Sequence, residues 1–164
     1  MILHAGLVAL RLDGHWRGAL ILGPSGAGKS DLALKALDAG FALVADDRVV
    51  VWPSGGLLFG RAPGPLTGLI EARGHGIVRE SSLAMAEIVL AVSCDEDETI
   101  ERMPELETLE VAAVRVPRVR LNPFEASAPA KLRRALQHLG HSPQQAYQAR
   151  SSGGGDRLGT GDTL

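Results

Sequence analysis

Residues 18–30 read GALILGPSGAGKS, in which a run of small and apolar residues leads directly into a glycine-rich loop. The loop has the pattern G-x-x-x-x-G-K-[ST] and comprises Gly23, Pro24, Ser25, Gly26, Ala27, Gly28, Lys29 and Ser30. Glycines in such a loop let backbone N–H groups turn inward around a phosphate. We therefore predict that residues 23–30 bind the phosphates of a nucleotide. Lys29 would supply a positive charge for the outer phosphates, and Ser30 would offer a hydroxyl to Mg²⁺.

The residues on either side of the loop favour this interpretation over a chance glycine-rich turn. Residues 16–22 predict a strand, and the turn signal Asp13-Gly14 joins it to a strand predicted over residues 4–12, so that the chain opens with a hairpin. Residues 31–39 are mostly helix formers, and Gly40 is well placed to end that helix. The helix would direct its positive N-terminal end at the bound phosphate.

The remaining segments predict an α/β protein with a mixed sheet and flanking helices. Strand patterns, an irregular Gly- and Pro-rich loop, an acidic exposed segment and an amphipathic helix follow one another along the chain. We predict strands over 41–44, 49–52, 57–60, 86–92 and 109–119, the loop over 61–76, the acidic segment over 94–101 and the helix over 130–139.

Composition bounds the kind of protein this is. The chain has 164 residues, of which 45% are apolar and 22% charged, so that it suits one globular domain with a core of its own. The formal net charge of −2 does not suggest a nucleic-acid partner, which would require a basic face. No apolar run approaches the length that crosses a bilayer, so we expect no membrane partner.

The two ends of the chain and its cysteine content give further expectations. The N-terminus has no basic segment before its apolar stretch, which argues against a signal peptide, and a single cysteine, Cys94, permits no intrachain disulfide. Both features fit a cytoplasmic protein. We predict a catalytic domain over residues 1–140 and a disordered tail over 141–164, because the polar and glycine-rich tail can bury little apolar area.

Asp46 and Asp47 are candidates for chemistry at the loop. They follow the strand predicted after the loop's helix, and in an α/β sheet such a strand often runs beside the first, with its end opening onto the same crevice. A carboxylate there can hold Mg²⁺, as we predict for Asp46, or accept a proton from an attacking hydroxyl, as we predict for Asp47. The alternative is a solvent-exposed turn, because Asp-Asp-Arg is a sequence commonly found in turns.

Glu71 and Arg73 form a charged pair flanked by glycines in the stretch IEARGHG, residues 70–76. Such a pair can bring Glu71 to a metal and Arg73 to a phosphate. From spacing alone, an exposed Glu–Arg pair in a loop is the slightly favoured explanation of the stretch.

Three ordered motifs together resemble the catalytic domain of the HPr kinase/phosphorylase family. They are the loop GPSGAGKS, the block LVADDRV at 43–49 and the block EARGHGI at 71–77, and the resemblance covers residues 3 to 140. It implies a P-loop fold related to phosphoenolpyruvate carboxykinase. It also implies an ATP- and Mg²⁺-dependent serine protein kinase that phosphorylates HPr, the phosphocarrier of the sugar phosphotransferase system, and works as a homo-oligomer, typically a hexamer.

The resemblance also assigns roles to individual residues. Asp47 matches the family's acid/base and Lys29 the residue that contacts the transferring phosphate, while Ser30 and Glu71 match residues that serve Mg²⁺. His4 matches the family's histidine in the strand before the loop. Arg102 resembles the family's later catalytic arginine.

Two departures from the family pattern stand out. Full-length members carry an N-terminal domain, whereas this chain begins at the catalytic domain and looks like the truncated form of some proteobacteria. Many members also remove the phosphate from HPr by phosphorolysis, but the late Gly-Arg-Asn type segment tied to that reaction is replaced here by LNPFEASAP, residues 121–129. Two alternatives to an HPr kinase are a kinase with a different acceptor and a regulatory module that binds nucleotide without transfer.

Overall fold

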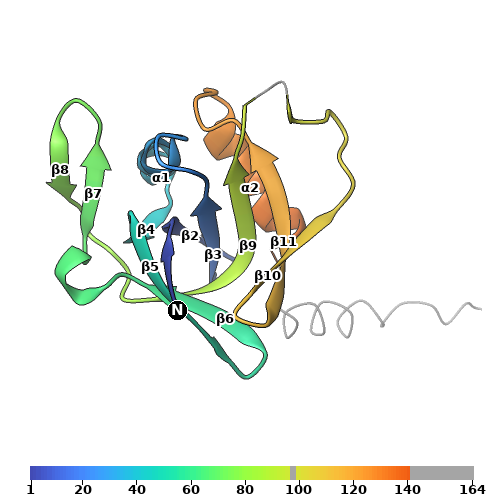
Figure 1. Ribbon diagram of the computed structural model, residues 1–164, viewed down its shortest axis with the longest axis horizontal. Helices are drawn as coiled ribbons and strands as arrows, with labels where there is room; N and C mark the ends of the chain where they lie inside the picture. Colours follow the sequence, from blue (N-terminus) through green and yellow to red (C-terminus); the bar gives the residue numbers. More distant parts are fainter. Residues whose placement is uncertain (97–98, 141–164) are drawn as a thin grey trace, which may run out of the picture.

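The structure is a computed structural model, and it describes residues 1–96 and 99–140. The tail predicted over residues 141–164 lies outside the described residues. Figure 1 shows helices packed on a strongly curled sheet, with a separate hairpin at one side. The elements are β1 Ile2–His4, β2 Gly6–Leu12, β3 His15–Leu22, α1 Lys29–Asp38, β4 Ala42–Ala45, β5 Arg48–Ser54, β6 Leu57–Arg61, the 3₁₀ turn η1 Gly64–Leu66, β7 Leu69–Ala72, β8 Gly76–Arg79, β9 Ala86–Cys94, β10 Glu107–Val111, β11 Val114–Leu121 and α2 Ala128–His138.

The sheet is organised around β9. Its C-terminal half lies between β3 and β11 and is parallel to both, while its first residues pair with β6. The order is β1-β5-β6-β9-β3-β2-β4, with β11 paired to β9 and β10 paired to β11. Because β2 is antiparallel to both β3 and β4, the strands β3, β4, β9 and β11 all point the same way. Their carboxyl ends therefore meet at one edge of the sheet.

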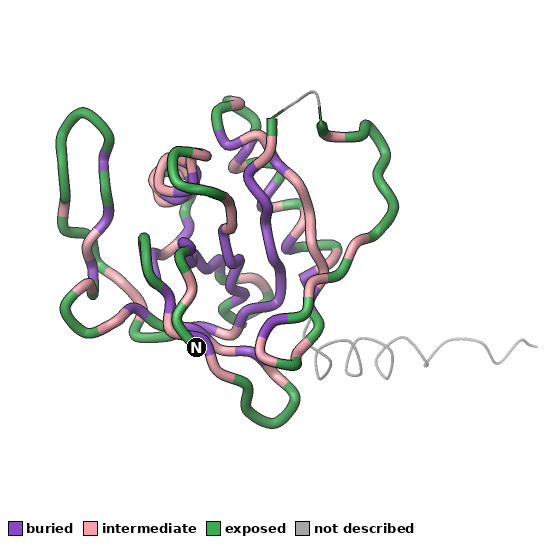
Figure 2. The backbone as a smooth tube through the Cα atoms, in the orientation of Figure 1, coloured by how far each residue is buried: buried purple, intermediate pink, exposed green. Residues whose placement is uncertain are grey.

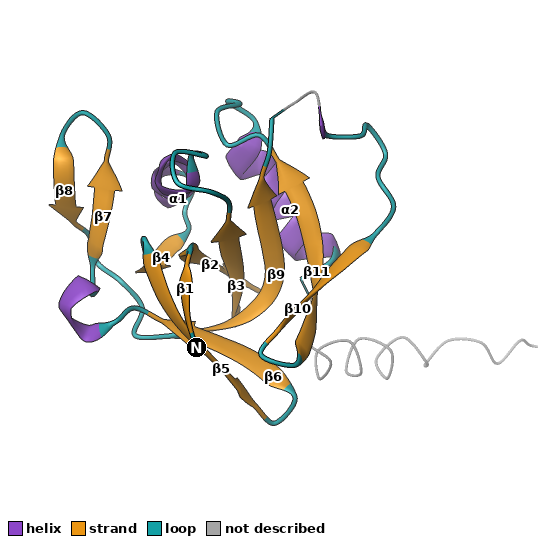
Figure 3. Ribbon diagram, viewed as in Figure 1, coloured by secondary structure: helices purple, strands orange, loops and turns teal. Residues whose placement is uncertain are grey.

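Alternating side chains of the central strands fill two cores, one on each face of the sheet. Val8, Ala19 and Ile21 pack against the apolar faces of α1 and α2, including Leu32 and Leu132. On the opposite face, residues such as Leu7 and Leu20 pack against the layer formed by β1, β5 and β6, among them Val49, Val51 and Leu58. The buried path through the central strands is visible in Figure 2, and Figure 3 shows α1 and α2 near each other, which agrees with their packing on one core. Within the described residues, no helix is long and apolar enough to cross a membrane.

The structure confirms most of the predicted elements and corrects three expectations. The strand β4 does not lie beside β3, because β2 is inserted between them. Part of the region predicted as an irregular loop forms the antiparallel hairpin of β7 and β8, which is a sheet of its own. The stretch predicted as one strand over 109–119 belongs to two strands, β10 and β11, joined by a turn at Ala112 and Ala113.

Candidate functional site

The glycine-rich loop connects the end of β3 to the start of α1. Gly28 precedes the helix with a φ of 95°, and no side chain caps the first turn of α1. The first N–H groups of a helix have no partner within the helix. Here they face the loop, so that the segment offers backbone donors and the positive end of a helix to an anion.

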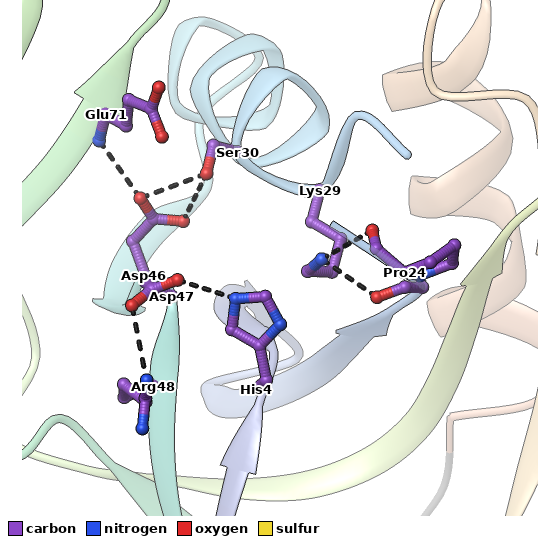
Figure 4. Close-up of polar contacts among 9 residues, drawn as sticks. His4, Pro24, Lys29, Ser30, Asp46, Asp47, Arg48 and Glu71 are labelled. Atoms are coloured by element: carbon purple, nitrogen blue, oxygen red, sulfur yellow. Dashed lines mark hydrogen bonds and ion pairs between the residues drawn. The ribbon is translucent and has the colours of Figure 1, made fainter. Parts of the chain in front are cut away.

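Lys29 lies along the loop with its ammonium group held by backbone carbonyls. Its Nζ donates hydrogen bonds to the oxygens of Gly23, at 2.8 Å, and Pro24, at 2.9 Å, and the residue is buried. These bonds shape the loop and keep a positive charge at its centre (Figure 4). A bound phosphate would meet that charge.

The carboxylate of Asp46 is anchored directly to the loop. Ser30 Oγ donates to Asp46 Oδ1 at 2.9 Å, with Oδ2 at 3.1 Å, and the backbone N–H of Glu71 donates to Oδ2 at 3.0 Å. Asp46 is buried, and a buried carboxylate needs such partners. These contacts bring the residue after β4 and the end of β7 to the N-terminus of α1.

Asp47 occupies a turn that few residues adopt. Its φ is 65°, and the N–H of Arg48 donates to Asp46 O at 2.7 Å, which defines a γ-turn of the rare positive-φ kind. The N–H of Ala5 donates to Asp47 O at 3.1 Å and holds this turn against the start of β2. Such strain is often found at functional positions, and here it directs the Asp47 side chain away from its neighbour Asp46.

The Asp47 carboxylate forms a pair with a histidine from another strand. His4 Nε2 lies 2.7 Å from Asp47 Oδ1, and Arg48 Nε lies 3.6 Å from Oδ2. Both His4 and Asp47 are about half exposed, so that the pair is open to an incoming group. Figure 4 shows the imidazole of His4 between Asp47 and the loop.

These side chains line one pocket of about 230 Å³. Nine of its ten lining residues were named in the sequence analysis, either as members of the loop or as side chains with Mg²⁺, phosphate or catalytic roles, and Asp31 is the tenth. The lining residues are His4, Ser25, Gly26, Gly28, Lys29, Ser30, Asp31, Asp47, Glu71 and Arg73. The fold therefore brings the predicted loop, Asp47, His4 and Glu71 together, and Asp46 lies behind Ser30.

Arg102 is not among these residues. It is exposed and lines a separate hollow between the segment before β10, the strand β11 and the helix α2. That hollow carries an ion-pair cluster in which Arg120 contacts Asp95 at 2.8 Å and Glu107 at 3.0 Å. The hydrogen bond from Arg120 lowers the pKa of the Glu107 carboxyl. The catalytic role predicted for Arg102 remains a prediction, since the described residues do not place it at the loop.

One neighbour of the loop, the segment after β11, was not predicted from the sequence to lie there. A Cβ atom on Gly28 would lie 2.7 Å from Pro123 Cγ and 2.8 Å from Phe124 Cζ. Pro123 and Phe124 thus pack directly on the loop. Only the parallel pairing of β11 with β9 brings them there, and that pairing is a long-range feature.

Replacing Gly28 by Ala is expected to destabilise the protein. The left-handed conformation costs about 1–2 kcal/mol for a residue with a Cβ, and the contact with Pro123 and Phe124 adds about 1–3 kcal/mol of overpacking. Gly26→Ala is the matched control, since Gly26 has a φ of 81° but open space around it. Urea unfolding should give a smaller loss for Gly26→Ala than for Gly28→Ala, and equal losses would contradict the packing.

Cys94 ends β9 beneath the start of the loop, and a Cβ on Gly23 would lie 3.2 Å from Cys94 Cβ. Burial raises the pKa of its thiol to about 11, although the charge of Lys29 opposes this effect. The folded state therefore holds the neutral thiol. The contribution of this thiol to the free energy of unfolding is present below pH 9 and is lost as the pH rises towards 11. We expect a thiol reagent to label Cys94 far more slowly in the native protein than in urea at pH 8. Equal labelling rates would contradict this burial.

The donor set around Ser30 is compatible with Mg²⁺. The described residues contain no group of three or more His, Cys, Asp or Glu side chains that could hold a metal by themselves. Mg²⁺ is usually held by one or two carboxylates together with phosphate oxygens and waters. The Ser30 hydroxyl and the Asp46 carboxylate, already in contact beside the phosphate loop, match that requirement, and Glu71 lines the same pocket.

A mixed sheet whose central strand enters a G-x-x-x-x-G-K-S loop, with an aspartate fixed on the loop's serine, defines this chain as a P-loop α/β protein. The family model described as the HPr Serine kinase C-terminal domain matches residues 3–132. The chain belongs to this family.

Individual relatives agree with the family match. The HPr kinase/phosphorylases of Streptococcus sanguinis and Streptococcus gordonii are each 34% identical to the chain over 154 residues, which cover 87% of this chain and 47% of theirs. The chain thus spans about half the length of the curated relatives it matches. The structure of the HPr(Ser) kinase/phosphatase from Coxiella burnetii superposes with a TM-score of 0.71 at 22% identity, covering 93% of this chain and 99% of that one. This likeness confirms the predicted α/β fold.

Proposed function

We propose that this chain is an ATP-dependent protein serine kinase that phosphorylates an HPr-type phosphocarrier protein. The observation that supports it most is the carboxylate of Asp47, paired with His4 at 2.7 Å, in the pocket that the phosphate-binding loop lines. Binding alone requires no proton acceptor beside the phosphates. A hydroxyl that attacks a phosphate does require one.

The proposed reaction assigns each side chain a task. Asp47 accepts the proton of the acceptor serine as the serine oxygen forms its bond to the terminal phosphorus, and the bond from that phosphorus to the bridging oxygen breaks to release ADP. Lys29 and the N–H groups of the loop hold the phosphates, and Ser30, Asp46 and Glu71 would hold Mg²⁺, which neutralises phosphate charge. His4 orients the Asp47 carboxylate. Positioning and electrostatics supply most of the rate in such transfers.

HPr is named as the substrate of the relatives, and this supports the proposed acceptor. Family resemblance further supports action in the cytoplasm as a homo-oligomer, typically a hexamer, which light scattering on the purified protein would test. The replaced segment at residues 121–129 argues for a predominant kinase reaction. Release of pyrophosphate from phospho-HPr and inorganic phosphate measures the reverse reaction.

The test is phosphoryl transfer from labelled ATP to purified HPr of the same organism, followed by mapping of the modified residue. We expect label on one serine of HPr and none on an HPr variant in which that serine is Ala. Label on other proteins but not on HPr would refute the acceptor. ATP binding without transfer to any acceptor would instead favour a regulatory module.

A further inference from the structure

The sheet places two different kinds of chemistry on opposite sides of the phosphate-binding loop. The loop follows β3, and Asp46 and Asp47 follow β4, two strands away in one direction. The segment with Phe124 follows β11, which lies two strands away in the other direction. All these strands end at the same edge (Figure 1), where ligands of open α/β sheets bind.

This arrangement gives an extended nucleotide one orientation on the loop. The terminal phosphate must face Asp47 and His4, which line the pocket on the β4 side. The rest of the nucleotide then leads across the loop towards β9 and β11. Pro123 and Phe124 lie on that side of the loop and pack against Gly28.

Phe124 is held firmly but left open. Lys35 Nζ on α1 donates to Pro123 O at 2.9 Å, and the N–H of Phe124 donates to Asn122 Oδ1 at 3.0 Å. The Phe124 side chain nevertheless stays 56% exposed. An aromatic ring fixed beside a phosphate site and open to solvent is a ready stacking surface for a planar base.

We propose that Phe124 is the platform on which the nucleobase of the bound nucleotide stacks. This rests on the proposed function, since it assumes a nucleotide on residues 23–30. A phenyl ring carries no hydrogen-bonding group, so stacking on it favours planar bases without distinguishing adenine from guanine. It deepens the account of the site by giving the base a location that none of the three sequence motifs predicts.

The test compares a ligand with a base and one without, in the full chain. Titration calorimetry measures ADP and inorganic tripolyphosphate binding to the wild type and to Phe124→Ala, Phe124→Leu and Phe124→Trp. We expect Phe124→Ala and Phe124→Leu to weaken ADP binding by about tenfold, the typical worth of one stacked base. Tripolyphosphate affinity should be unchanged in both, and Phe124→Trp should keep ADP affinity.

The outcomes separate stacking from mere support of the loop. Equal losses for ADP and tripolyphosphate would show that Phe124 only shapes the loop, and unchanged ADP affinity in Phe124→Ala would also overturn the proposal. Recovery in Phe124→Leu would indicate apolar packing without stacking and would contradict it. If the wild type bound neither ligand, the result would refute both the phosphate site and the proposed function.

Discussion

Asp47→Asn is expected to reduce phosphoryl transfer by about a hundredfold to ten-thousandfold, the range in which general bases contribute, while ATP still binds. Asn tolerates a positive φ about as well as Asp, so that the γ-turn at this position should persist. The amide can still contact His4, but it cannot accept the serine proton. The measurement is the single-turnover rate of transfer at saturating ATP, together with the ATP dissociation constant.

The control for this variant is Asp38→Asn, which removes an exposed carboxylate at the far end of α1. It should transfer at the wild-type rate. Full transfer by Asp47→Asn would remove Asp47 from the mechanism. A loss of ATP binding in Asp47→Asn would mean that the carboxylate serves the nucleotide and not the acceptor.

Lys29→Ala is expected to have the largest effect on nucleotide affinity. Hydrogen bonds to charged groups contribute about 1.5–3 kcal/mol each, so that loss of the ammonium should weaken ATP binding at least tenfold. The carbonyls of Gly23 and Pro24 also lose their partner, which loosens the loop. Titration calorimetry with ATP gives the affinity, and urea unfolding gives the accompanying loss of stability.

Arg115→Ala is the matched control for Lys29→Ala. It also removes one positive charge, but Arg115 is exposed on the β10–β11 hairpin, where it forms an ion pair with Glu110. Its ATP affinity should equal that of the wild type. Wild-type affinity in Lys29→Ala would contradict the role given to the loop lysine.

The sequence predicted the parts of the site whose chemistry is local. The loop pattern, the strand before it and the helix after it lie within one short stretch, and the structure places them as expected. Asp46 and Asp47 were expected at the same crevice, which is confirmed, although β2 separates their strand from β3. Asp46 and Asp47 still reach the loop because β4 is parallel to β3, and the carboxyl ends of parallel strands lie at the same edge of the sheet.

Features that depend on distant pairing or unusual backbone were not predictable. The turn at Ala112 and Ala113 has two positive φ angles without a glycine or asparagine, so the sequence pattern predicts one strand where the structure has β10 and β11. The β7–β8 hairpin is built from a Gly-rich stretch with the composition of a loop. Phe124 reaches Gly28 because β11 pairs with β9, and no local sequence pattern predicts that contact.

The central claim is that residues 23–30 cradle the phosphates with Asp47 facing the outermost one. A crystal structure of the protein with Mg²⁺ and a non-hydrolysable ATP analogue tests it most directly. We predict the terminal phosphate in the pocket lined by Lys29, Asp47 and His4, with Ser30 at the metal. Phosphates bound elsewhere, or an Asp47 carboxylate turned away from the terminal phosphate, would contradict the account.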